Sequence, residues 1–200
     1  MTTMMTPQAR FDHLCRVVTS TRFLTRQGLG NEVPFFICSY PPVQVVEMEE
    51  ARRQLLRHVA NRNVRVLDIN LFDITIEMLE ERGILEEIVE IEVETGKDEL
   101  RELLQGVLDP RQHLVPRIAA RMEAQPHDVV FLSGVGEVYP FLRASLVLEN
   151  LQSTVKESPL LMFFPGEYVA HLGRMLALHL FGKVPPERYY RAFDVFNYEA

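Results

Sequence analysis

Cysteine is scarce in this sequence. Only two occur in 200 residues, Cys15 and Cys38. They fall on separate predicted elements, and neither belongs to a C-x-x-C pair or has a histidine at metal-ligand spacing. These absences argue against a disulfide framework and a metal centre. We therefore expect both thiols to be reduced and buried, and we predict no metal and no cofactor.

Long apolar runs are absent as well. No stretch approaches the roughly 20 apolar residues that cross a bilayer. Met1 to Arg10 lacks the charged-then-apolar pattern of a signal peptide, and no low-complexity segment interrupts the chain. The sequence favours a cytoplasmic protein without a membrane partner, folded over residues 1–200 as a single domain.

Positive charge is in the minority, since 21 Lys and Arg against 28 Asp and Glu give a net charge of −7. A nucleic-acid backbone would meet no global attraction. One local exception is a run of arginines between a predicted helix and the next strand, which is either a weak DNA-binding patch or a solvated helix face. Its members are Arg52, Arg53, Arg57, Arg62 and Arg65. The acidic segment Glu77 to Glu94 is likewise either a docking face for a basic partner or a solvated face.

Short apolar segments alternate with helical patterns along the chain. They predict strands at residues 34–39, 64–71, 128–132 and 159–164, and residues 189–195 fit an edge strand less clearly. Helices are predicted at 11–23, 43–61, 137–151 and 172–181, and another, capped by Asp73, ends near Gly83. The pattern indicates an α/β fold with a mostly parallel, Rossmann-like sheet of four to five strands flanked by helices. A mainly helical insertion around residues 77–122 separates the second and third strands.

Two predicted strand-turn-helix units point to a binding crevice at the carboxyl ends of parallel strands. SGVGE at residues 133–137 resembles a glycine turn that lets a phosphate approach a helix N-terminus. However, Tyr139 replaces the third glycine of G-x-G-x-x-G and no P-loop lysine follows, so a tight turn without a ligand is the simpler interpretation. The candidate crevice residues are Gly134, Gly136, Glu137, Gly166, Glu167 and Tyr168, with Asp68, Asn70 and Asp73 from an earlier strand end. Since no nucleophile elbow or triad is present, we predict no catalytic residue and no enzyme activity.

Five segments, in order along nearly the whole chain, resemble the small B component of BREX phage-defence systems. They are GLGNEVPFFI (28–37), LDINLFD (67–73), DVVFLSGVGEVYPFLR (128–143), LLMFFPGEY (160–168) and YYRAF (189–193). The resemblance implies a role in bacterial defence beside a large ATPase, a DNA methyltransferase and an alkaline-phosphatase-like protein. It offers no catalytic residue to carry over.

The activity implied by this resemblance is that of an adaptor or scaffold. Its expected partners are other BREX proteins, first the alkaline-phosphatase-like component, and it would reach DNA only through the assembled complex. A degenerate nucleotide-binding switch and a weak DNA-binding accessory protein remain alternatives, and a homodimer stays open.

Overall fold

Seven strands of the described residues form one sheet whose central part is parallel. The computed structural model describes residues 5–27, 33–171, 175–185, 189–190 and 192–200. The strands are β1 (Phe35–Tyr40), β2 (Val66–Asn70), β3 (Val129–Ser133), β4 (Leu160–His171), β5 (Met175–Leu180), β6 (Tyr189–Tyr190) and β7 (Phe193–Asp194). The order β2-β3-β4-β1-β7 is parallel throughout, and β5 and β6 extend β4 in antiparallel fashion. The predicted mostly parallel α/β sheet is confirmed, with more strands than expected.

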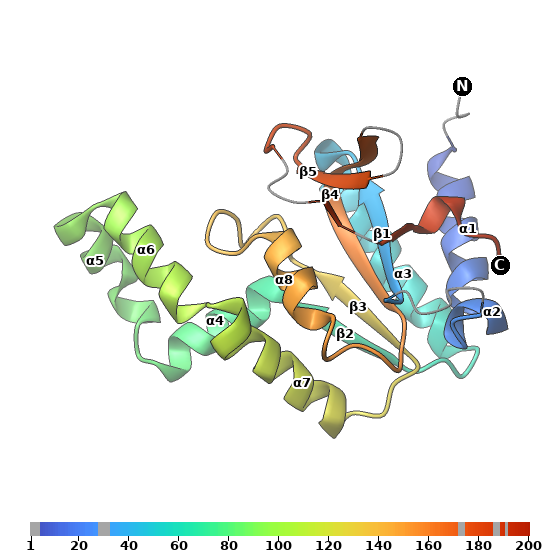
Figure 1. Cartoon of the computed structure of the whole chain (residues 1–200), viewed down its shortest axis with the longest axis horizontal. Coiled ribbons are helices and arrows are strands. Elements are labelled where there is room, and N and C mark those ends of the chain that lie inside the picture. Colours follow the sequence, from blue (N-terminus) through green and yellow to red (C-terminus); the bar gives the residue numbers. More distant parts are fainter. Residues whose placement is uncertain (1–4, 28–32, 172–174, 186–188, 191) are drawn as a thin grey trace.

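Helices cover both faces of this sheet (Figure 1). They are α1 (Pro7–Val18), α2 (Thr21–Leu24), α3 (Val45–Ala60), α4 (Leu71–Glu81), α5 (Ile88–Thr95), α6 (Lys97–Val107), α7 (Val115–Ala124) and α8 (Ala144–Leu151). Shorter turns of helix are η1 (Pro42–Gln44), η2 (Leu85–Glu87), η3 (Pro110–Leu114) and η4 (Val195–Asn197). Helices α1 to α3 lie on one side, α4, α7 and α8 lie on the other, and α5 and α6 project away from the sheet.

The two faces of the sheet form separate cores. Successive side chains of a strand point to opposite faces, so Phe35 and Ile37 join the core under α4, α7 and α8. Phe36 and Cys38 join the core under α1 and α3, where Cys15 is also buried, and neither cysteine forms a disulfide. Burial on both faces explains why these strands are apolar without alternation.

The helices between β2 and β3 confirm the predicted helical insertion. Helix α4 begins directly after β2, and its cap is Asn70 rather than the predicted Asp73. The Asn70 side chain accepts hydrogen bonds from the backbone N–H groups of Phe72, at 2.8 Å, and Asp73, at 3.4 Å. The expected stop at Gly83 is present, because this residue has φ +69° just beyond the helix end. Within the described residues, no helix combines the length and apolar character that a membrane span needs.

The predicted helix at 137–151 is wrong in its first half. Residues 134–142 form a series of turns, and α8 begins only at Ala144. A residue that precedes proline is disfavoured in the helical region, and Tyr139 precedes Pro140. Val135, Val138 and Leu142 are buried in these turns at three- and four-residue spacings, which is why the segment imitates a helix.

The second strand-turn-helix unit is also absent. In place of a turn at Pro165 and a helix at 172–181, β4 continues to His171 and pairs with β5, although residues 172–174 lie outside the described part. Strand β4 pairs with β1 as far as Pro165 and with β5 from Gly166 onward. A Cβ at Gly166 would lie 2.2 Å from the His179 carbonyl oxygen, so the glycine permits the close approach of β5. The region 189–195 supplies two short strands, β6 and β7, in place of one.

Candidate binding surfaces at the carboxyl edge of the sheet

Two clefts open at the carboxyl edge, where the parallel pairing of β1 to β4 ends. The first, here the α3 cleft, has a volume of about 410 Å³ and lies between the start of α3 and the ends of β2 and β3. The second, here the C-terminal cleft, has a volume of about 620 Å³ and lies beside the β4–β5 corner and η4. Tyr40, the last residue of β1, lines both. Both volumes fall in the range of small-ligand sites.

Most of the predicted crevice residues divide between these clefts, whereas Gly136, Asp68 and Asp73 line neither. Gly134 and Glu137 line the α3 cleft together with Asn70, whereas Gly166, Glu167 and Tyr168 line the C-terminal cleft. The division follows from β4, which runs on past the edge of the parallel sheet where a turn was expected. Asp68 is ion-paired to Arg52, and Asp73 lies in the first turn of α4.

The glycines of the turn after β3 are explained by packing. Gly134 has φ +77°, and a Cβ there would lie 2.1 Å from Asn70 Oδ1 and 2.8 Å from the Phe72 nitrogen. A Cβ on Gly136 would lie 3.0 Å from Pro165. No helix starts at this turn, so the strand-turn-helix geometry on which the phosphate-binding hypothesis rested is absent from it. The geometry therefore does not favour the nucleotide-binding alternative.

Arg52 is the most enclosed charged group of the α3 cleft. Its side chain lies between α3 and β2, where Nε and Nη2 donate to the Glu49 carboxylate at 3.0 and 2.7 Å. Nη1 donates to both oxygens of Asp68. These hydrogen bonds raise the pKa of Arg52 against the opposing effect of burial. The guanidinium thus ties the helix to the sheet.

The other predicted DNA-binding arginines are mostly neutralised in the same way. Arg53 and Arg57 pair with Glu50 at 3.6 and 3.5 Å, and Arg65 at the amino end of β2 forms a bidentate pair with Asp128. Arg62 contacts His58. Counting Arg52, four of the five cations face carboxylates, which weakens the case for a phosphate-binding patch.

Structural contacts also account for the polar groups of the C-terminal cleft. The Tyr168 hydroxyl donates to the Ala192 carbonyl at 2.7 Å and accepts from the Ala192 N–H at 3.1 Å. Burial is the main cause that raises its pKa. Asp194 accepts from Phe196 N at 2.9 Å and from Asn197 Nδ2 at 3.1 Å, and burial raises its pKa too. Among the described residues, no group of three or more His, Cys, Asp or Glu is placed to hold a metal ion.

Exposed apolar side chains lie in the α3 cleft and on the segments beside it, and the sequence reasoning missed them. Val43 and Val46 are 87% and 74% exposed, and Val45 and Phe72 are exposed as well. Val45 and Val46 line the cleft, and Phe72 follows Asn70, which forms its wall. Val46 is the second residue of α3 and lies within the predicted helix 43–61. The signal that separates it from the buried Leu55 is the helical spacing, because nine residues are about two and a half turns and place the two side chains on opposite sides of the helix.

Known relatives agree with the segments noted in the sequence. The family model for BREX protein BrxB matches residues 67–195. A BREX protein BrxB from Bacillus cereus (strain H3081.97) is 33% identical over 192 residues, covering 94% of this chain and 96% of the relative. Another from Escherichia coli O9:H4 (strain HS) is 33% identical over 176 residues, covering 88% of this chain and 84% of the relative. Comparison with solved structures gave no match. The chain therefore belongs to the BrxB family of BREX proteins.

Proposed function

We propose that this chain is an adaptor that binds another BREX protein through the carboxyl edge of its sheet. As a BrxB protein it is a component of a BREX system, which is consistent with phage defence. Other BREX proteins are accordingly its partners, and the alkaline-phosphatase-like component is the first candidate. The adaptor role does not require a catalytic group at either cleft.

The observation that carries this proposal is the gathering of exposed apolar side chains beside the α3 cleft. Single apolar residues scattered over a surface need no explanation, but a contiguous patch next to a concave site marks an interaction surface. Val43, Val45, Val46 and Phe72 are half of the large apolar side chains that are exposed in the described residues. Glu49, Arg53 and Glu137 add a charged rim to the same cleft, and an apolar centre with a polar rim is the usual composition of a protein interface.

Co-purification tests the proposal. The tagged chain is recovered from cells that carry the complete BREX operon, and the eluted complex is sized and identified by mass spectrometry. We expect one BREX protein in stoichiometric amount. The double variant Val43→Glu/Val46→Glu places two charges in the apolar patch and should weaken that association at least tenfold, about 1.4 kcal/mol.

A matched control lies on the same helix. Ala60 is exposed at the far end of α3, so Ala60→Glu adds a carboxylate away from the patch and should leave the complex intact. Thermal melts of both variants establish that they fold. A wild-type chain that elutes alone would contradict the adaptor proposal, and a complex equally resistant to both variants would contradict the assignment of this surface.

A further inference from the structure

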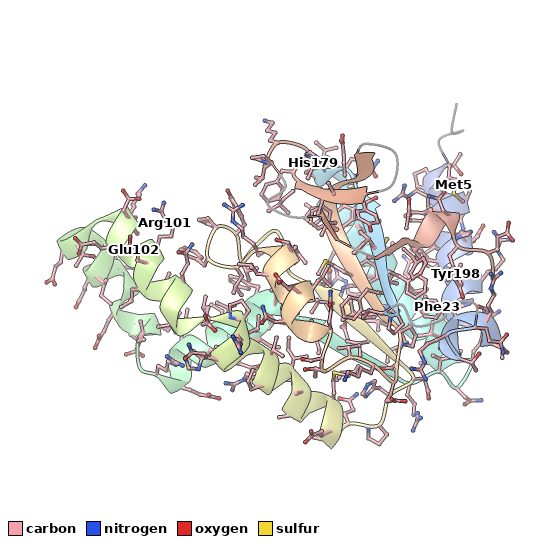
Figure 2. All side chains as sticks on the ribbon, in the orientation of Figure 1. Met5, Phe23, Arg101, Glu102, His179 and Tyr198 are labelled. Carbon is pink, nitrogen blue, oxygen red and sulfur yellow. The ribbon has the colours of Figure 1, made fainter. Side chains whose placement is uncertain are left out.

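A second surface, distinct from the carboxyl edge, lies on the hairpin of α5 and α6, here the acidic arm (residues 84–107). Figure 1 shows both helices projecting from the body, and Figure 2 shows Arg101 and Glu102 on α6 at the opposite end of the molecule from Tyr198. The arm contains eight carboxylates and two cations, Lys97 and Arg101. Its net charge of −6 nearly equals the −7 of the whole chain.

Most carboxylates of the arm have no ion-pair partner among the described residues. Among the described residues of the arm, only Asp98 forms an ion pair, with Arg101 at 3.1 Å. At the base of the arm, by contrast, Glu77 and Glu81 are both paired with arginines of α7. The seven carboxylates without an ion-pair partner in the described structure are Glu86, Glu87, Glu90, Glu92, Glu94, Glu99 and Glu102. Their mutual repulsion is only partly offset by the cations of the described residues.

Exposed apolar side chains run through this negative surface. Val89 and Val93 are 69% and 81% exposed and, four residues apart, share one face of α5. Leu103 is exposed on α6. No residue of α5 is buried, so the two valines do not stabilise the fold through burial in the core. Valine is also a poorer helix former than alanine, so helix propensity does not explain them either.

The arm is nevertheless held in place. Leu100, Leu104 and Val107 on the inner face of α6 are buried in the core that also contains α4, α7 and α8. Ile88 and Ile91 of α5 also pack against this core, so Val89 and Val93 are displayed on the outer side of a helix that is held in place. Exposed valines among carboxylates without ion pairs fit a partner that supplies both apolar contact and positive charge.

We propose that the acidic arm is a docking surface for a basic protein, namely a lysine- and arginine-rich face with an apolar centre that covers Val89 and Val93. This inference rests on the adaptor function and adds a second attachment point, so that one chain holds two partners or two parts of one partner. Nucleic acid does not fit the surface because its phosphates carry the same sign of charge. A second copy fits poorly, because it would bring two arms of net charge −6 together.

Biolayer interferometry tests the inference by measuring how the wild-type chain binds each purified BREX protein encoded in the same operon. We expect a protein that binds the wild type, with an association rate that falls between roughly 50 and roughly 300 mM salt because screening shortens the range of the attraction. Glu90→Lys/Glu94→Lys should weaken binding at least tenfold. Val89→Ser/Val93→Ser, which keeps the charge, should raise the dissociation rate several-fold.

The control for net charge is Glu123→Lys/Glu199→Lys, which makes the same charge change at two exposed positions outside the arm. It should bind within twofold of the wild type. Equal weakening by both charge reversals would overturn the assignment of the arm, as would binding that neither arm variant alters. Self-association of the wild type in sedimentation analysis, lost in Glu90→Lys/Glu94→Lys, would overturn the basic partner in favour of a second copy.

The two proposals fail in different ways. If no BREX protein binds the wild type, both the adaptor function and the arm are contradicted. If a BREX protein binds and only Val43→Glu/Val46→Glu weakens it, the adaptor function stands and the arm is overturned. Loss of binding with the arm variants alone supports the arm and contradicts the carboxyl edge as the attachment surface.

Discussion

Replacing Arg52 by methionine is the sharpest structural perturbation of the α3 cleft. Methionine retains most of the packing of the arginine stem but removes the cation between Glu49 and Asp68. The two carboxylates are then left facing one another across the interface of α3 and β2. If Arg52 were a solvated surface residue, as the sequence allowed, the substitution would hardly change the free energy of unfolding.

The magnitude follows from burial. Breaking a fully buried ion pair by removing one partner costs about 3–5 kcal/mol. Since the Asp68 and Glu49 side chains keep 33% and 41% of their exposure, solvent offsets part of this penalty. We expect Arg52→Met to lower the free energy of unfolding by about 2 kcal/mol, which for a chain of this size lowers Tm by about 4–8 °C.

Urea unfolding measures this change against a matched control. Arg57 lies on the same helix and pairs with Glu50 at 3.5 Å, but its side chain is 69% exposed. Arg57→Met should therefore lower the free energy of unfolding by less than about 0.5 kcal/mol. Arg52→Met/Asp68→Asn removes one of the stranded charges and should recover part of the loss. If Arg52→Met lowers the free energy of unfolding no more than Arg57→Met does, the conclusion that the Arg52 ion pair is enclosed and stabilising is refuted.

Three further predictions concern other parts of the fold. Gly134→Ala should lower the free energy of unfolding by at least about 2 kcal/mol, because the residue has φ +77° and no room for a Cβ. Gly106→Ala should raise the free energy of unfolding by about 0.5–1 kcal/mol, because Gly106 lies in a helix and a Cβ there would meet nothing within 4 Å. Urea midpoints of the two variants that move in the same direction would contradict this. Burial raises the pKa of the Cys38 thiol to about 12, so a thiol reagent at neutral pH should label it only after unfolding, and rapid labelling of the native chain would be the contrary result. Hydrogen bonding to Arg65 holds the pKa of Asp128 below its usual range, so its stabilising contribution is present above about pH 4 and is lost as the pH falls through the lower, folded-state value. Asp128→Asn should therefore flatten the fall in stability on acidification, and an unchanged profile would disprove the link.

The central strands could be predicted because they are apolar on both faces. Four or five consecutive buried residues, as in β1 and β3, are too few for a buried helix and leave a parallel strand as the simplest solution. The turn glycines were also recognisable as sites of close backbone approach, although Gly134 serves packing against Asn70.

Strand β5 could not be predicted in the same way. Met175–Leu180 consists largely of good helix formers, and its strand conformation is set by pairing with the second half of β4. Pairing of this kind depends on the path of β4 beyond Pro165, which local propensity does not encode. The same path divides the single crevice expected from the sequence into two clefts.

One of the exposed apolar side chains at the α3 cleft could have been recognised from the sequence. Val46 lies nine residues before Leu55, which is about two and a half helical turns, so it points to the side of α3 opposite the buried stripe. Leu55 and Val59, further along the same helix, are buried as the pattern predicts. The spacing along the helix therefore separates the exposed Val46 from the buried Leu55 and Val59.

Sizing of the complex recovered from cells with the full BREX operon tests the adaptor claim most directly. We expect the wild-type chain to elute with a stoichiometric BREX protein, Val43→Glu/Val46→Glu to release it, and Ala60→Glu to leave it bound. Elution of the wild-type chain alone, under conditions in which the other BREX proteins are expressed, would contradict the adaptor claim.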